Sequence, residues 1–376
     1  MSSIWTILLS SIAERYPRSM PRMSRLLSFR PDQKLLEMLR GAGVAEPVVQ
    51  NVVESGYYMR VWSDLMGGTY ETVSDLMYGN KQFSSSFKFD AFLRYLNGDS
   101  SFDPAPPFMD FTVRSIEDIN AVLANSHLQR YIADGSLTFR GQVREYRYRR
   151  SVPNPYRRAA DGTELSILPG AFRQSGAEYR FSSEPPAAMS MDWLYHELEP
   201  NNLNVYSDSH FAYDPMRVEQ HYASQTTGLD LTFDINTALF FATHQFTISN
   251  GIATLNPIAT GAHKGVIYLF RFTQPSVKKS EFLVESFDLF KTYPPERILR
   301  QNCGLPLIGD YERNIAICDI DCILRLHPEF ECNTLRSPTE IFPSAAEDPF
   351  YRKLLELKGR FPEELDDVVE FAWARS

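Results

Sequence analysis

Residues 137–142 have the sequence Leu-Thr-Phe-Arg-Gly-Gln, in which apolar and polar side chains alternate as far as Gly141. Successive side chains of a strand point to opposite faces, so Leu137 and Phe139 would share one face and Arg140 the other. We therefore predict a strand with an apolar face in the core and a guanidinium aimed at a cleft. A planar guanidinium suits paired hydrogen bonds to a phosphate or a carboxylate. Gly141 has no side chain, so a ligand or another strand can approach the backbone closely.

A second polar cluster is predicted where residues 229–232 run into a helix. Asp230 and Thr232 lie two residues apart on an expected strand and share a face. Asp234 then caps a helix at once, and a helix N-terminus beside polar groups can bind an anion such as a pyrophosphate. Two structural alternatives remain open. Capping alone would contribute ~1 kcal/mol to helix stability, and Asp230 can instead form an internal ion pair with Arg140.

The composition indicates a globular protein with more than one domain. The chain has 376 residues, of which 43% are hydrophobic and 13% aromatic, and this length suits two or three domains. The net charge of -9 argues against nonspecific coating of nucleic acid or of an anionic membrane. Four cysteines are too few for a disulfide scaffold. The apolar run at residues 4–9 is too short to cross a bilayer, so we expect a cytoplasmic protein without membrane contact.

The periodicity predicts an α+β fold in three parts. Residues 1–110 are expected to form a helical N-terminal region, residues 111–332 a mixed α/β domain, and residues 333–376 a helical tail. Helices are predicted in the first two parts after Asp32 and Ser115, which have side chains suited to N-caps, and at residues 46–58, 64–78 and 87–96.

Further elements are predicted around the two polar stretches. The helix after Asp234 should extend as far as Phe246, because apolar residues recur there at helical spacing. Residues 265–272 are apolar on both faces, which is typical of a central strand, and residues 315–324 predict another strand. The tail should form two short helices divided by Pro362.

Three segments, in order, resemble the FRG-domain family over residues 131–330. They are Phe139-Arg140-Gly141-Gln142; Gln220-His221-Tyr222 with Leu229–Thr232 and Ala238–Ala242; and Arg297–Gln301 before Gly304. The chain departs from the family pattern at Thr227, where the family has an arginine, and at Cys303, where it has a glycine. These departures put the chemistry in doubt unless another arginine takes over.

The motif order is similar to that of ADP-ribosyltransferases, so the resemblance implies a split-sheet domain that uses NAD as substrate. It implies a macromolecular acceptor, protein or nucleic acid, and a role as a toxin or in antiviral defence, with the N-terminal region available to a partner protein. The implied catalytic residues are Arg140, Asp230 and Gln301. The implied NAD-binding residues are Arg140, Gly141, Gln142, His221, Tyr222 and Thr232.

Individual roles follow from side-chain chemistry. Thr232 would contact the nicotinamide-side ribose, and Tyr222 would stack on a ring of NAD, although core packing is the commoner use of a tyrosine. His221 would serve the same site, although a lone histidine is more often a hydrogen-bonded core residue. Gln301 can hydrogen-bond a ribose hydroxyl but has no titrating group. The general base would therefore be one of Glu281, Glu285 and Glu296.

An arginine-rich run favours a second hypothesis. Seven arginines lie between Arg140 and Arg158, interleaved with Tyr146, Tyr148 and Tyr156. Arginines with aromatic residues bind single-stranded nucleic acid through phosphate contacts and base stacking, so a noncatalytic nucleotide- or nucleic-acid-binding module is the alternative. A solvated loop that pairs with the many carboxylates is the structural alternative.

No metal site is expected from the sequence. Cys318, Cys322, His327 and Cys332 are close in sequence, but the first two lie on a predicted strand. At ~3.3 Å per residue their side chains would be about 13 Å apart, too far for one ion.

Overall fold

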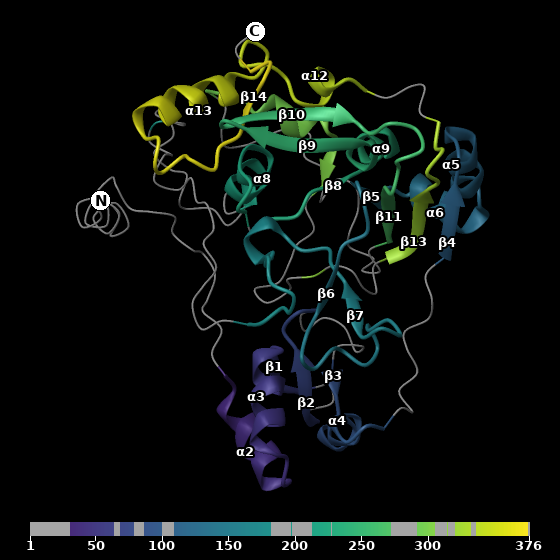
Figure 1. The fold of residues 1–376 in the computed structure, drawn as a ribbon, viewed down its shortest axis with the longest axis vertical. Coiled ribbons are helices and arrows are strands. Elements are labelled where there is room, and N and C mark those ends of the chain that lie inside the picture. Colours follow the sequence, from purple (N-terminus) through teal and green to yellow (C-terminus); the bar gives the residue numbers. More distant parts are fainter. Residues whose placement is uncertain are drawn as a thin grey trace.

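The computed structural model describes residues 31–63, 68–78, 86–99, 109–181, 197, 213–226, 228–271, 292–304, 314, 320–331 and 336–374. These residues form an α+β structure, as the sequence predicts (Figure 1). The predicted features at residues 4–9, Thr227, Cys318 and Cys332 lie outside the described residues. Among the described helices, none has both the length and the apolar character needed to cross a membrane.

A six-stranded sheet forms the upper part of the molecule in Figure 1. Its strands are, in spatial order, β12 (Cys303–Gly304), β8 (Leu231–Thr232), β5 (Leu137–Gln142), β11 (Val266–Arg271), β13 (Ile320–Leu326) and β4 (Met109–Val113). Only the β13–β4 pair is parallel. The predicted strands at 137–142 and 265–272 are confirmed, and both are central. The described part of the strand predicted at 315–324 belongs to β13.

Helix α9 (Ile235–Thr243) packs directly on β5, and Gly141 is the residue that permits it. The side chain of Asp234 accepts hydrogen bonds from the backbone N–H groups of Asn236 and Thr237, which confirms the predicted cap. A Cβ atom at Gly141 would lie 1.7 Å from the carbonyl oxygen of Ala238 on α9. The motif glycine is therefore needed for helix–sheet packing.

The prediction that this helix extends to Phe246 is wrong. The helix ends at Thr243, and the chain continues as a hairpin of β9 (His244–Ser249) and β10 (Ile252–Pro257). Asn250 and Gly251 connect the strands with φ of 51° and 77°. Asn-Gly is the preferred pair for a two-residue hairpin turn, because both central residues need positive φ. This local signal overrides the helical periodicity.

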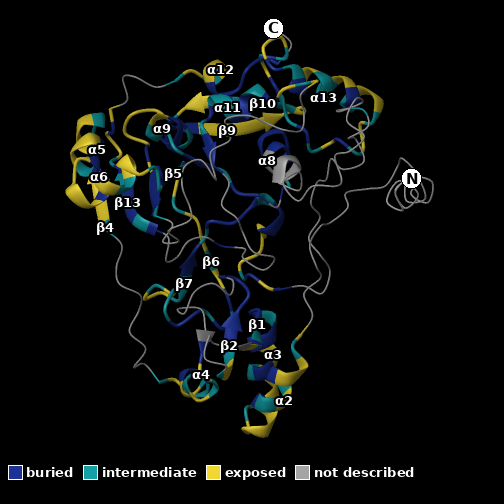
Figure 2. Ribbon diagram, turned by 180° about the vertical axis from the view of Figure 1, so that it is seen from behind, coloured by how far each residue is buried: buried dark blue, intermediate teal, exposed yellow. Residues whose placement is uncertain are grey.

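The N-terminal region is a small α/β unit at the lower end of Figure 1. Its elements are α2 (Gln33–Gly41), α3 (Glu46–Glu54), β1 (Tyr57–Ser63), β2 (Thr69–Asp75), β3 (Ser86–Phe87) and α4 (Phe89–Leu96). The predicted cap at Asp32 is confirmed. The helix predicted at residues 64–78 is wrong, because threonines and Val73 favour a strand and β2 pairs with β1 along its whole length. Figure 2 shows the buried parts of β1 and β2 beside α3.

Further elements surround the sheet and the hairpin. They are α5 (Ile116–Leu123), α6 (Ser126–Ala133), β6 (Arg147–Arg149), β7 (Thr163–Leu165), η2 (Gly170–Phe172), α8 (Tyr213–Tyr222), α11 (Glu296–Arg300), α12 (Pro338–Ile341), α13 (Pro349–Arg360) and β14 (Glu370–Phe371). The cap at Ser115 is confirmed. The second helix predicted in the tail is wrong, because Phe371 of β14 instead pairs with Ala253 of β10 and joins the core.

Candidate functional site

Two adjoining cavities lie beside the strand that carries Arg140. The larger has a volume of about 670 Å³ and the smaller about 290 Å³. The residues that line both are Arg140, Arg173, Phe241, Phe246 and Phe342. The two cavities therefore meet at a pair of arginines and three phenylalanines.

Arg140 enters this cleft from β5, as the alternation of the strand predicts. One guanidinium nitrogen donates a hydrogen bond to the backbone carbonyl of Asp230 at 2.6 Å, while Nε is buried without a partner among the described residues. No described carboxylate lies within 4 Å of this guanidinium. Burial, and next the charge of Arg173, lower the pKa of Arg140 to about 10, although the Asp230 carboxylate opposes this shift.

Arg173 reaches the same cleft from the loop after η2. Its Nε donates to the carbonyl of Leu168 at 3.0 Å, and burial lowers its pKa. Gly170 holds this loop close to residues 224–226, since a Cβ there would lie 2.0 Å from the carbonyl oxygen of Ser224. Two cations thus share a cleft in which the fold supplies little negative charge, and this arrangement suits an anionic ligand.

His221, Asp230 and Cys303 converge at the smaller cavity. The His221 Nε2 atom lies 3.0 Å from the Cys303 sulfur and 3.2 Å from a carboxylate oxygen of Asp230. The Cys303 sulfur is 3.8 Å from that same oxygen. The pairing of β8 with β12 produces this contact, because it sets Cys303 opposite Thr232, two residues after Asp230.

Burial dominates the electrostatics of this group. It lowers the pKa of His221 to about 3, with the positive charge of Arg297 acting in the same direction. It raises the pKa of Asp230 to about 7, while the charge of Arg140 opposes the rise. The side chains of His221 and Asp230 are 1% and 34% exposed, so the carboxylate is the more open to the cleft.

Gln301 hydrogen-bonds His221 and the backbone around it. Its side chain hydrogen-bonds that of His221, and its Nε2 donates to the carbonyl of Ile341 at 3.3 Å. Thr232 was predicted to contact the ribose. Its hydroxyl instead donates to the backbone carbonyl of Gln301 at 2.7 Å and so holds the segment that carries Gln301. The backbone then turns through Asn302, whose φ of 52° is left-handed.

Tyr222 and Arg297 border the smaller cavity and are fully buried among aromatic side chains. The Arg297 guanidinium lies 4.3 Å from the ring centre of Tyr222 and 4.5 Å from that of Tyr351, and it donates to the carbonyl of His221 at 2.5 Å. The Tyr222 hydroxyl donates to Asp348 at 2.6 Å. Tyr222, predicted as a stacking residue, is therefore packed in the core, and the tail residues help to fix the backbone of His221.

The remaining predicted residues lie apart from this group. Gln142 lines the larger cavity, and its side-chain oxygen is buried without a partner among the described residues. Of the candidate bases, Glu296 begins α11 but lines neither cavity, and Glu281 and Glu285 lie outside the described residues.

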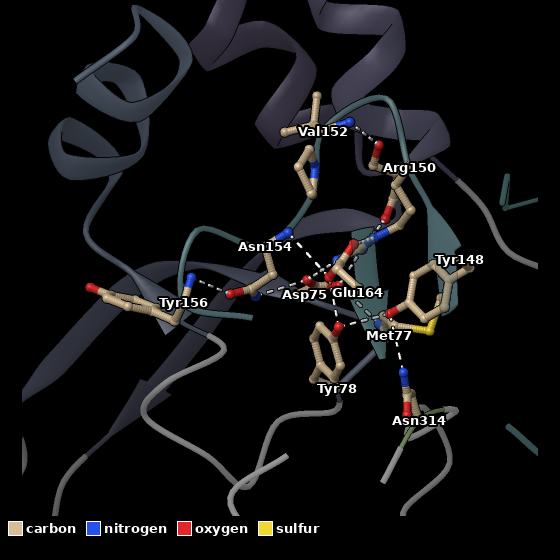
Figure 3. Close-up of polar contacts among 12 residues, drawn as sticks. Asp75, Met77, Tyr78, Tyr148, Arg150, Val152, Asn154, Tyr156, Glu164 and Asn314 are labelled. Atoms are coloured by element: carbon tan, nitrogen blue, oxygen red, sulfur yellow. Dashed lines mark hydrogen bonds and ion pairs between the residues drawn. The ribbon is translucent and has the colours of Figure 1, made fainter. Parts of the chain in front are cut away.

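The arginine-rich run divides into residues with different surroundings. Arg150 is fully buried and binds the carboxylates of Asp75 and Glu164 through four hydrogen bonds of 2.7 to 2.9 Å (Figure 3). Asn154 donates to Asp75 and Tyr78 donates to Glu164 in the same network. This network joins β2 of the N-terminal unit to β7, so Arg150 pairs with carboxylates as the structural alternative states, but it is buried rather than solvated.

The other arginines of the run are mostly exposed. Arg147 pairs with Glu145 at 2.6 Å, Arg149 donates to the carbonyl of Asp161 at 2.8 Å, and the Arg144 guanidinium lies 4.9 Å from the ring centre of Tyr146. Arg147, Arg149 and Tyr146 line the larger cavity. They form a basic rim that continues from Arg140.

Sequence reasoning missed three residues of this site. Arg173 stands in an irregular stretch without a pattern, Arg297 was noticed only as part of a motif, and Cys303 only as a departure from a glycine. A comparison of the chain with protein-family models, with curated proteins and with solved structures finds no match.

Proposed function

We propose that this chain is an NAD-dependent ADP-ribosyltransferase-like enzyme of the FRG-domain type that modifies a macromolecular target. The observation that carries the proposal is the pair of Arg140 and Arg173 at the junction of the two cavities. Arg140 is held by one carbonyl and has a buried Nε without a described partner. A pyrophosphate would supply the missing acceptors and offset the repulsion between the two guanidinium groups.

The volumes of the cavities support a dinucleotide. Cavities of about 300–1,000 Å³ commonly hold small ligands, and the two described here are about 290 and 670 Å³. With the pyrophosphate on the arginines, the nicotinamide ribose enters the smaller cavity near Asp230 and Gln301. The adenosine then lies in the larger cavity, along Tyr146 and Gln142.

The reaction needs few groups from the protein. The bond between nicotinamide and the ribose carbon breaks, nicotinamide leaves with the electron pair, and a nucleophile of the acceptor bonds to that carbon and loses its proton to solvent. Asp230 faces the cleft, where a carboxylate favours the positive charge that develops on the ribose. Gln301 orients the side chain of His221, and both residues line the smaller cavity.

Incubation of the purified protein with labelled NAD, with and without cell lysate, tests the proposal through nicotinamide release and label transfer. Turnover that vanishes in Arg140→Ala and persists in Arg149→Ala is the expected result. Full activity of Arg140→Ala would sink the assignment. The labelled species would name the acceptor, and a role as a toxin or in antiviral defence would follow from its identity.

A noncatalytic module that binds nucleotides or nucleic acid is the second candidate. Arg147, Arg149 and the half-exposed Tyr146 favour it, because a basic rim with an aromatic ring can bind phosphates and stack on a base. It predicts salt-sensitive binding of RNA or DNA that survives Arg140→Ala.

A further inference from the structure

We propose that His221, Asp230 and Cys303 form a binding site for a divalent cation of the zinc type, which sequence reasoning did not expect. The three residues come from α8, from the segment before β8 and from β12. Their donor atoms are an imidazole nitrogen, a carboxylate oxygen and a sulfur, all within 4.8 Å of one another. These are the three ligand types that zinc takes in proteins.

Two of the three contacts within the group share one atom. His221 presents the same nitrogen, Nε2, to both the Cys303 sulfur at 3.0 Å and the Asp230 oxygen at 3.2 Å. A neutral imidazole has either one proton or one lone pair on that nitrogen. With Nε2–H donating to the sulfur and the thiol donating to the Asp230 oxygen, the three atoms form a short chain of hydrogen bonds. A cation bound by all three atoms would replace this chain with three metal–ligand bonds.

The separations are close to those of a metal site. With zinc bonds of about 2.0–2.1 Å to nitrogen, 2.0–2.2 Å to oxygen and 2.3 Å to sulfur, tetrahedral geometry sets ligand atoms roughly 3.3–3.6 Å apart. The observed distances are 3.0, 3.2 and 3.8 Å. Each differs from the tetrahedral range by roughly half an ångström or less.

The neighbours of His221 also fit a ligand role. Metal-bound histidines usually donate their other ring N–H to an oxygen that fixes the ring. The Gln301 amide donates from its nitrogen to Ile341, which leaves its oxygen to accept from His221. Arg297 holds the His221 backbone carbonyl as well. Gln301 thus orients the ring of His221, and Arg297 fixes its backbone.

A bound ion would occupy the Asp230 carboxylate that the proposed function assigns to the ribose, so it would oppose that reaction rather than assist it. A thiolate and a carboxylate cancel the charge of a divalent ion, and the Cys303 thiol proton is released to solvent on binding. Arg140 and Arg173 then remain as uncompensated cations beside it, so an anion is the expected fourth ligand or neighbour. Because His221 and Asp230 line the smaller cavity, the open coordination position faces that cavity.

Metal analysis of the full-length protein tests this site without an activity assay. We expect close to one zinc per chain after loading and dialysis, and a thiolate-to-cobalt absorption band when Co²⁺ is added. Cys303→Ala should abolish the band and weaken zinc binding by about 100-fold or more. Cys322→Ala is the matched control, because Cys322 is also a buried free cysteine but lies in β13.

Two outcomes would overturn the proposal. One is a protein that takes up no zinc and shows no cobalt band, which would mean a hydrogen-bonded group only. The other is a band that survives in a folded Cys303→Ala variant, which would mean that the ion binds elsewhere. If Cys303→Ala does not fold, Asp230→Asn serves as the second variant, because its more exposed side chain is less needed for the core.

Discussion

Arg140 and Arg150 are ten residues apart in the sequence and lie in opposite electrostatic situations. Arg150 makes four hydrogen bonds to two carboxylates, which raise its pKa despite complete burial. Arg140 makes one described hydrogen bond, to a carbonyl, and burial with a neighbouring arginine lowers its pKa. The fold pairs one guanidinium with two carboxylates and gives the other no carboxylate contact among the described residues.

The bonding partners, rather than burial, therefore distinguish these two arginines. A buried cation is stable only when paired and hydrogen-bonded, and the network around Arg150 meets that condition with protein groups alone. The cleft around Arg140 meets it only in part. A ligand with phosphate oxygens would complete the hydrogen bonding of Arg140, whereas protein carboxylates already complete that of Arg150.

The largest expected effect is on stability, from Arg150→Met. Removing this guanidinium leaves the buried carboxylates of Asp75 and Glu164 unpaired, which typically costs about 3–5 kcal/mol. The matched substitution Arg140→Met removes one hydrogen bond and a repulsive neighbour of Arg173, so we expect a change within about 1 kcal/mol. Urea unfolding followed by circular dichroism measures both. Equal destabilisation by the two substitutions would remove the distinction between the two sites.

The next effect concerns the glycine beside Arg140. Gly141→Ala forces a Cβ against the Ala238 carbonyl and should destabilise the protein by about 1–3 kcal/mol, because α9 must move away from β5. Gly359→Ala is the control, since nothing lies within 4 Å of a Cβ there and the site is in helix α13. It should stabilise by up to about 1 kcal/mol. A neutral Gly141→Ala would mean that the glycine serves ligand access instead.

A smaller effect is expected on binding, from Arg173→Met. If both arginines hold one pyrophosphate, this substitution should weaken ADP-ribose binding roughly 10- to 100-fold, because charge-assisted hydrogen bonds contribute about 1.5–3 kcal/mol each. Calorimetry on Arg173→Met, Arg140→Met and the double variant measures it. The two losses should not add, since the residues share a ligand. If Arg173→Met binds ADP-ribose with wild-type affinity, the two arginines do not share one pyrophosphate and only Arg140 can bind it.

Local patterns predicted much of the fold, and long-range pairing decided the rest. The caps at Asp32, Ser115 and Asp234 and the strand at 137–142 depend on neighbouring residues, so the sequence reveals them. β2 depends on its pairing with β1, which no local pattern displays. The Asn250-Gly251 turn was a readable signal that the helical periodicity obscured.

The candidate site divides in the same way. Arg140, Asp230 and Gln301 were predicted from motifs, and the structure brings them to one cavity. Cys303 contacts His221 across 82 positions of sequence, and Arg173 reaches the cleft from an irregular loop. No sequence spacing identifies either residue as part of the site. Cys303 reaches it through the pairing of β8 with β12, and Arg173 reaches it through the packing of the 170–173 loop.

The smallest expected effect comes from Arg147 and Arg149 on the rim. Both already have partners, Glu145 and the Asp161 carbonyl, so replacing both by alanine should change ADP-ribose affinity by less than about threefold and stability by about 0.5 kcal/mol or less. Binding of single-stranded RNA, measured by fluorescence anisotropy at several salt concentrations, gives the opposing test. If these rim arginines bind phosphates, the double variant should lose roughly two units of salt slope. That loss, together with RNA binding unaffected by Arg140→Met, would favour the noncatalytic nucleic-acid-binding module over the enzyme.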